Sequence, residues 1–166
     1  LPWLVGLLLL ESVNAFIVHR YEEVLATIPI IAAFMTTMAD AGGNTGGQSS
    51  TLIIRSMALG DIELKDWWKV LLRESYVGLV LGSILGAVLF VRGFMISHNI
   101  VVNFSAALSL LIIIVFANVV GSMLPFIGKL MRIDPAVMAG PLITTIADLA
   151  GIWIYFAVVT YMLRIR

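Results

Sequence analysis

The stretch IVVNFSAALSLLIIIVFANVVGSMLPFI at residues 100–127 contains no charged side chain. Crossing roughly 30 Å of hydrocarbon takes a helix of about 20 mostly apolar residues, so this stretch is long enough to span a bilayer. Its apolar residues form a continuous run rather than an alternation with a period of two, which favours a helix over a barrel strand. The stretch therefore predicts a transmembrane helix.

Further apolar segments lie on both sides of it, at residues 2–18, 25–59, 71–91 and 136–163. The 166-residue chain is 61% hydrophobic and 12% charged, and most of its charged residues fall between these segments or at their ends. Five crossings use nearly the whole chain and leave no room for a soluble domain. We therefore expect an all-α integral membrane protein with five transmembrane helices.

The second of these segments is interrupted by a glycine-rich stretch. Residues 25–38 are apolar, but at 1.5 Å per residue they cover roughly 21 Å and are too short to cross alone. Asp40 and the sequence AGGNTGGQ at residues 41–48 follow, and helical character resumes over residues 49–59. We predict two half-helices joined by an unwound stretch that is buried in protein or lines a wet cavity. A flexible hinge or surface loop is the alternative.

Small and polar residues in the third and fourth segments predict helix packing. Gly78, Gly82 and Gly86 recur at intervals of four, a stripe that lets another helix approach closely. Asn118 and Ser122 lie one turn apart in the fourth segment, and we expect them to form hydrogen bonds across helices.

Basic residues are more frequent around the connectors after the second and fourth segments than at the opposite side. The first group comprises Arg55, Lys65, Lys69, Arg73, Lys129 and Arg132, and the second comprises Arg20, Arg92, Arg164 and Arg166. Because basic residues favour the cytoplasmic side, we expect the amino terminus inside and the carboxyl terminus outside.

Asp148 is the most distinctive candidate for a functional site. It lies about 12 residues into the fifth segment, near the bilayer midplane. A lone carboxylate there costs several kcal/mol unless a cation, a partner or water stabilises it. Thr144, Thr145, Gly151 and Tyr155 follow the helical spacing of its face, so this stripe could line a pore. The alternative is a structural carboxylate, bonded to a neighbouring helix or kept protonated.

Two prolines bear on the start of the fifth segment. Asp134 and Pro135 suit the N-cap and the first turn of a helix. Pro141 would then lie inside the helix, where its missing amide hydrogen frees the carbonyl of Val137 for an ion or water. Gly140 permits a close approach of the backbone. An ordinary proline kink is the alternative.

The glycine-rich stretch offers oxygen ligands for a hard cation. It carries backbone carbonyls, the amides of Asn44 and Gln48 and the carboxylate of Asp40. The chain has no cysteine, and both histidines fall in predicted loops, so magnesium, calcium or manganese fits better than zinc or copper. Glu11 in the first segment is another intramembrane acid, for which a functional and a structural role remain equally open.

No phosphate loop, GxSxG or HExxH motif occurs, so we expect no enzymatic activity.

Two blocks of sequence resemble the MgtE family of magnesium channels. Residues 42–62, GGNTGGQSSTLIIRSMALGDI, are similar to the family's second membrane helix in the order of their glycine, asparagine, glutamine, serine and Arg-x-x-Ala-Leu-Gly positions. A second block runs from Asn118 through VVGSMLPF and DPAVMAGPLITTIAD to Asp148 and resembles the fourth and fifth helices. Together with the five-segment layout, the blocks cover essentially the whole chain.

The resemblance implies a homodimer in which the second and fifth helices of each subunit line a central pore. Asp148 would hold a magnesium ion, with the backbone at Gly140 and Thr144 and the side chain of Asn44 helping to coordinate the hydrated ion. Asp40 is the remaining candidate ligand. The family carries a cytoplasmic amino-terminal domain and paired CBS domains that close the pore. We expect residues 1–166 to be the ion-conducting membrane domain alone, without that gating.

The function expected from the residues and the resemblance is passive uptake of hydrated Mg²⁺ through a bacterial plasma membrane. The expected partners are a second copy of the chain, lipid and the divalent cation, and no nucleic acid. A secondary transporter, in which Asp148 or Glu11 binds sodium or a proton, is the first alternative. A membrane scaffold whose glycines only pack helices is the second.

Overall fold

The computed structural model describes residues 2–134 and 140–164, with side chains from Val5 onward. The secondary structure in these ranges is helical, which confirms the predicted all-α class. In chain order the elements are α1 (Pro2–Arg20), α2 (Glu22–Thr27), the 3₁₀ helix η1 (Pro29–Ile31), α3 (Ala32–Leu59), the 3₁₀ helix η2 (Leu64–Asp66), α4 (Trp67–Gly93), α5 (Ile100–Leu130) and α7 (Pro141–Leu163).

Three helical stretches within the described ranges are long and apolar enough to cross a membrane. They are Leu64–Gly93, Ile100–Leu130 and Pro141–Leu163, and they correspond to the third, fourth and fifth predicted segments. Neither α1 nor α3 is among them, so a crossing by each of these two helices remains a prediction.

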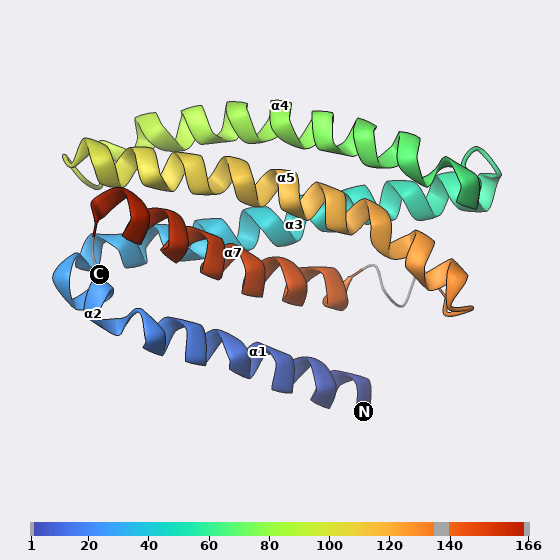
Figure 1. Cartoon of the computed structure of the whole chain (residues 1–166), viewed down its shortest axis with the longest axis horizontal. Coiled ribbons are helices and arrows are strands. Elements are labelled where there is room, and N and C mark those ends of the chain that lie inside the picture. Colours follow the sequence, from blue (N-terminus) through green and yellow to red (C-terminus); the bar gives the residue numbers. More distant parts are fainter. Residues whose placement is uncertain (1, 135–139, 165–166) are drawn as a thin grey trace.

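The long helices lie side by side, and consecutive ones run in opposite directions (Figure 1). α5 packs against α3, α4 and α7, whereas α1 lies on the outside and packs mainly against α7. The amino terminus and the α3–α4 connector lie at one end of the bundle, and the carboxyl terminus lies at the other (Figure 1). Which end faces the cytoplasm remains a prediction.

The prediction that the glycine-rich stretch is unwound was wrong, because α3 is a continuous helix from Ala32 to Leu59. Glycine inside a helix costs about 1 kcal/mol relative to alanine, but here it permits close packing. A Cβ atom added to Gly46 would lie 3.0 Å from the carbonyl oxygen of Ala117 and 2.9 Å from the side chain of Ile143. A Cβ atom on Gly121 would overlap the backbone of Gly46. The glycines therefore let α3 approach α5 and α7.

The glycine stripe of α4 packs against α5, as predicted. A Cβ atom added to Gly78, Gly82 or Gly86 would in each case lie 2.9 Å from a backbone atom of α5. Such distances leave no room for a side chain, so the stripe sets the separation of these two helices.

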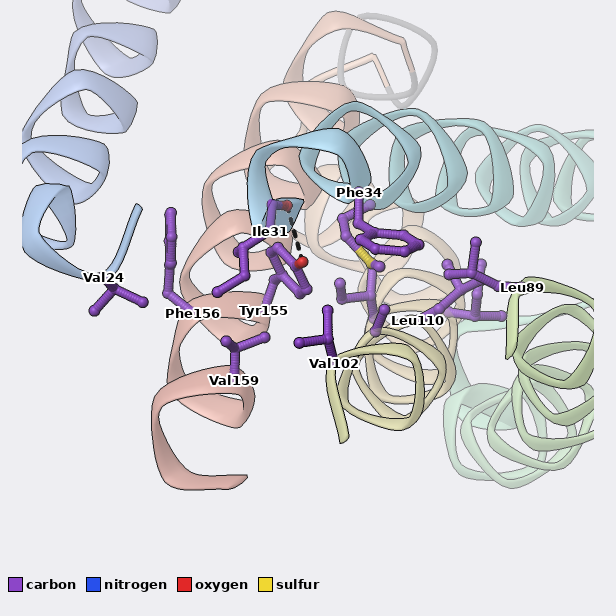
Figure 2. Packing of buried hydrophobic residues seen from close by; sticks show 13 residues of the cluster. Val24, Ile31, Phe34, Leu89, Val102, Leu110, Tyr155, Phe156 and Val159 are labelled. Carbon is purple, nitrogen blue, oxygen red and sulfur yellow. Dashed lines mark hydrogen bonds between the residues drawn. The ribbon is translucent and has the colours of Figure 1, made fainter. Parts of the chain in front are cut away.

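A cluster of buried side chains joins the start of α3 to α5 and the second half of α7 (Figure 2). Tyr155 is fully buried in it, and its hydroxyl donates a hydrogen bond of 2.9 Å to the carbonyl oxygen of Ile31. Gly151 is also buried, facing Met38 and Ile113. The prediction that these two α7 residues line a pore together with Asp148 was therefore wrong.

Pro141 is the first residue of α7, and Gly140 precedes it as the N-cap. A proline at the first helical position loses no intrahelical hydrogen bond, so the alternative of an ordinary proline kink inside α7 does not apply. The expectations for Pro135 and for the carbonyl of Val137 concern positions outside the described ranges.

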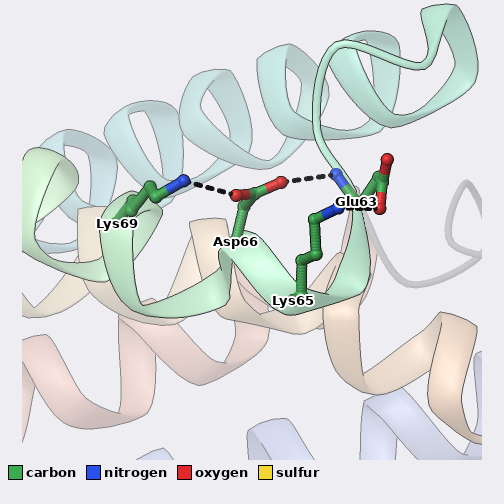
Figure 3. A network of polar contacts seen from close by, with 4 residues as sticks. All are labelled: Glu63, Lys65, Asp66 and Lys69. Carbon is green, nitrogen blue, oxygen red and sulfur yellow. Dashed lines mark hydrogen bonds and ion pairs between the residues drawn. The ribbon is translucent and has the colours of Figure 1, made fainter.

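The α3–α4 connector ends in a polar network (Figure 3). The backbone N–H of Glu63 donates to the carboxylate of Asp66 at 3.1 Å, which forms one half of a capping box at η2. Lys69 pairs with Asp66 at 2.9 Å, and Lys65 pairs with Glu63 at 2.8 Å. Both lysines are exposed, so each ion pair contributes little to stability.

Candidate cation site

An open pocket of about 590 Å³ lies between α3 and the beginning of α7. α3 contributes Asn44, Gln48 and Thr51, which follow the i, i+4, i+7 spacing of one helix face. α7 contributes Gly140 and Thr144. The polar groups of the two helices therefore converge on one space.

Thr144 is exposed, and its hydroxyl donates a hydrogen bond of 3.0 Å to the carbonyl oxygen of Pro141. A hydroxyl that donates its one proton still has acceptor capacity on its oxygen. Thr144 can therefore accept a hydrogen bond from water in the pocket without breaking this contact.

Asp148 lies one helical turn after Thr144 and borders the pocket. A Cβ atom added to Gly43 would lie 3.3 Å from the Thr144 side chain and 3.7 Å from Oδ1 of Asp148. The carboxylate is partly buried, and no hydrogen bond or ion pair involves it within the described ranges. The structural alternative of a carboxylate bonded to a neighbouring helix does not hold in this part of the chain.

Two other carboxylates lie on helices that pack against α7, the helix that carries Asp148. They belong to Glu11 on α1 and Asp40 on α3, and both side chains are exposed. Negative charges within a membrane span repel each other, and a divalent cation between them would lower this electrostatic energy.

These carboxylates do not form a direct metal cage. Among the described residues, no three histidine, aspartate or glutamate side chains are grouped closely enough to bind one metal ion. Mg²⁺ has ligand distances of 2.0–2.1 Å, dehydrates reluctantly and usually keeps several waters. The arrangement therefore suits an ion that keeps its water shell.

The structure thus places three of the five predicted ligands in the lining of one pocket. Asn44, Gly140 and Thr144 line the pocket and Asp148 borders it, whereas Asp40 lies about one turn of α3 away. Sequence reasoning missed Thr51 as a lining residue. The helical spacing from Asn44 would have found it had the glycine-rich stretch been read as a continuous helix.

The fold and the pocket define an all-helical, multi-pass membrane protein with a carboxylate beside a polar pocket between two of its helices. The family model of MgtE, described as a divalent cation transporter, matches residues 35–158. The chain therefore belongs to the MgtE family, which confirms the resemblance stated from its residues.

Three relatives are similar over nearly the whole chain. The "Magnesium transporter MgtE" of Thermus thermophilus is 39% identical over 162 residues, or 98% of this chain. The proteins of the same name from Enterococcus faecalis and Bacillus subtilis are 32% and 29% identical over 99% and 96% of it. The chain spans 36% of the length of each of these relatives. Membership of a transporter family agrees with the expectation that the chain is not an enzyme.

Proposed function

We propose that this chain conducts hydrated Mg²⁺ passively across a membrane, and that Asp148 with the α3–α7 pocket is its ion site. The observation that carries this proposal is a carboxylate without a bonded partner in the described ranges, on an apolar helix beside a polar pocket. Intramembrane acids are costly, and they mark ion pathways by default. The names of the three relatives support magnesium as the ion.

Recognition of the ion works through its water shell. The amides of Asn44 and Gln48 and the hydroxyl of Thr144 accept hydrogen bonds from the bound waters, which act as donors toward them. Asp148 supplies negative charge close to the ion. An ion held in this way does not have to lose its waters, and therefore crosses without the cost of dehydration.

A second copy of the chain completes the pore. The pocket is open, with Asn44, Gln48 and Thr144 exposed on one face of the single chain. A two-fold axis in front of this face places the same residues of a partner opposite them. The two copies of Asp148 then carry a charge that balances the two positive charges of the ion.

The membrane potential drives uptake in the predicted orientation, with the amino terminus inside. Each elementary charge gains about 2.3 kcal/mol per 100 mV, so a divalent ion gains about twice that amount.

The test is Mg²⁺ flux into proteoliposomes containing the wild type or Asp148→Asn at equal incorporation. Asp61→Asn is the matched control, because Asp61 is an exposed acid in the α3–α4 connector. Loss of flux in Asp148→Asn with normal flux in Asp61→Asn is the expected result. Equal flux from wild type and Asp148→Asn, or no flux from correctly incorporated wild type, overturns the proposal.

A coupled transporter is the second candidate, because α1, which carries the intramembrane acid Glu11, packs against α7, which carries Asp148, so that either acid could bind the coupled ion. Flux that depends on a proton or sodium gradient at constant membrane potential supports coupled transport. Flux that follows only the electrochemical potential of Mg²⁺ supports the channel.

A further inference from the structure

Glu74 is the single acidic residue of α4, and it lies on the side of α3 away from the ion pocket. It is partly buried, inside a helix that is apolar enough to cross a membrane. Its carboxylate accepts a hydrogen bond of 2.9 Å from the hydroxyl of Ser49 on α3. No cationic side chain pairs with it in the described part of the chain. An acidic side chain inside a membrane-spanning helix is costly, so we expect Glu74 to have a role of its own outside the ion pocket.

Glu74 takes part in a polar junction of three helices. The side-chain amide of Asn118 on α5 donates to the backbone carbonyl of Glu74 at 3.4 Å. The Ser49 hydroxyl also lies 3.3 Å from the backbone carbonyl of Asn118. Ser49 and Asn118 are buried, with exposed fractions of 5% and 2%. α3, α4 and α5 are therefore joined at one level.

This junction confirms the prediction that Asn118 forms a hydrogen bond across helices. The same prediction was wrong for Ser122, because its hydroxyl donates to the carbonyl oxygen of Val119 within α5.

The junction lies directly behind the pocket. Ser49 is adjacent in sequence to Gln48, and Gln48 and Thr51 belong to the same turn of α3 and line the pocket. Three residues earlier, the backbone contact of Gly46 with Gly121 holds α3 against α5. Beyond that contact, the Ser49 hydroxyl bonds α3 to the carboxylate of Glu74 on α4 and to the backbone carbonyl of Asn118 on α5.

We propose that Glu74 is a positioning residue for ion conduction: through Ser49 it fixes the rotation of α3 and thereby directs Gln48 and Thr51 into the pocket. The expected effect on flux rests on the proposed function, whereas the expected effect on the orientation of α3 does not. The contribution is made by a hydrogen-bond acceptor, so the negative charge itself is dispensable. Glu74→Gln keeps an acceptor oxygen at the same place, and Glu74→Leu removes it while making α4 more apolar.

The first test measures flux against Mg²⁺ concentration for wild type, Glu74→Gln, Glu74→Leu, Ser49→Ala and the double variant Glu74→Leu/Ser49→Ala. Hydrogen bonds to charged groups are strong enough that losing one can change the half-saturating concentration by up to about tenfold. We expect Glu74→Leu and Ser49→Ala to show similar shifts and the double variant no further shift. We expect Glu74→Gln to remain within about twofold of wild type.

Wild-type flux in both Glu74→Leu and Ser49→Ala overturns the inference while leaving the proposed function intact, provided that Asp148→Asn abolishes flux in the same experiment. Additive shifts in the double variant, or a Glu74→Gln variant as impaired as Glu74→Leu, also overturn it, since the carboxylate would then act by its charge or through another partner.

The second test does not depend on transport. The chain has no cysteine, so a single introduced cysteine is its only thiol. We expect Glu74→Leu to change the rate at which a water-soluble thiol reagent modifies Gln48→Cys by severalfold. Asn44→Cys is the control, because it precedes the Gly46 contact and should react at the same rate in both backgrounds. Unchanged rates at Gln48→Cys overturn the inference even if the chain conducts no ion.

Discussion

The carboxylate of Asp148 on α7 lies against the backbone of α3 at Gly43, where an added Cβ atom would be 3.7 Å from Oδ1. Gly43 also lines the pocket, so the Asp148 carboxylate lies at the edge of the pocket. The glycines of α3 therefore serve the candidate ion site as well as helix packing, and substitutions among them separate the two roles.

Gly46→Ala is expected to destabilise the protein by about 1–3 kcal/mol, because the new methyl group would press on the backbone of Ala117 and the side chain of Ile143. Gly47→Ala is the matched control, since nothing lies within 4 Å of its added Cβ atom. That variant should be neutral or more stable by up to about 1 kcal/mol, because alanine favours the helix. Thermal unfolding in detergent measures both. Equal stability of the two variants would mean that α3 does not pack as described.

Tyr155→Phe is expected to cost about 1 kcal/mol of stability without abolishing flux. The change removes the hydrogen bond to the Ile31 carbonyl and leaves a buried acceptor without this donor. Tyr161→Phe is the control, because Tyr161 is 83% exposed and should tolerate the change. Unfolding curves and flux assays on the same preparations test this. A complete loss of flux at unchanged stability would contradict this expectation and support the prediction from the sequence that Tyr155 lines a pore.

Thr144→Val is expected to raise the half-saturating Mg²⁺ concentration by about two- to fivefold. Valine keeps the shape of the side chain but removes the hydroxyl oxygen that can accept a hydrogen bond from a water of the ion. Thr27→Val is the control, since Thr27 is also exposed and bonded within its own helix but lies on α2, outside the pocket. Concentration-dependent flux measures the effect, and equal shifts in the two variants would contradict a role for the Thr144 hydroxyl.

Asp66→Ala is expected to lower the midpoint of chemical denaturation measurably, because Asp66 accepts a hydrogen bond from the backbone of Glu63 in the capping box. Lys65→Ala removes only an exposed ion pair and should stay within about 0.5 kcal/mol of wild type. Chemical denaturation in detergent compares them. If Lys65→Ala costs as much as Asp66→Ala, the ion pairs rather than the cap stabilise this connector.

Much of the candidate site could be predicted from local sequence. Asp148 was identified because an acid within a long apolar segment is conspicuous wherever the helix lies in the bundle. Asn44, Gly140 and Thr144 entered through the family resemblance, and the structure places them around one pocket with Asp148 beside it. Glu74 is also an acid within an apolar segment, but it was not singled out, and its partner Ser49 lies 25 positions away on another helix.

The sequence by itself determined the helical class, the membrane-spanning character of α4, α5 and α7 and the packing stripe of α4, because hydropathy and small-residue spacing act within one helix. Only the tertiary structure decided that the glycine-rich stretch stays helical and that Tyr155 is buried. A run of glycines is compatible with a break or with close packing, and the difference depends on whether another backbone lies against it. In α3 the partner is α5, whose Gly121 lies so close to the backbone of Gly46 that a side chain at Gly121 would overlap it.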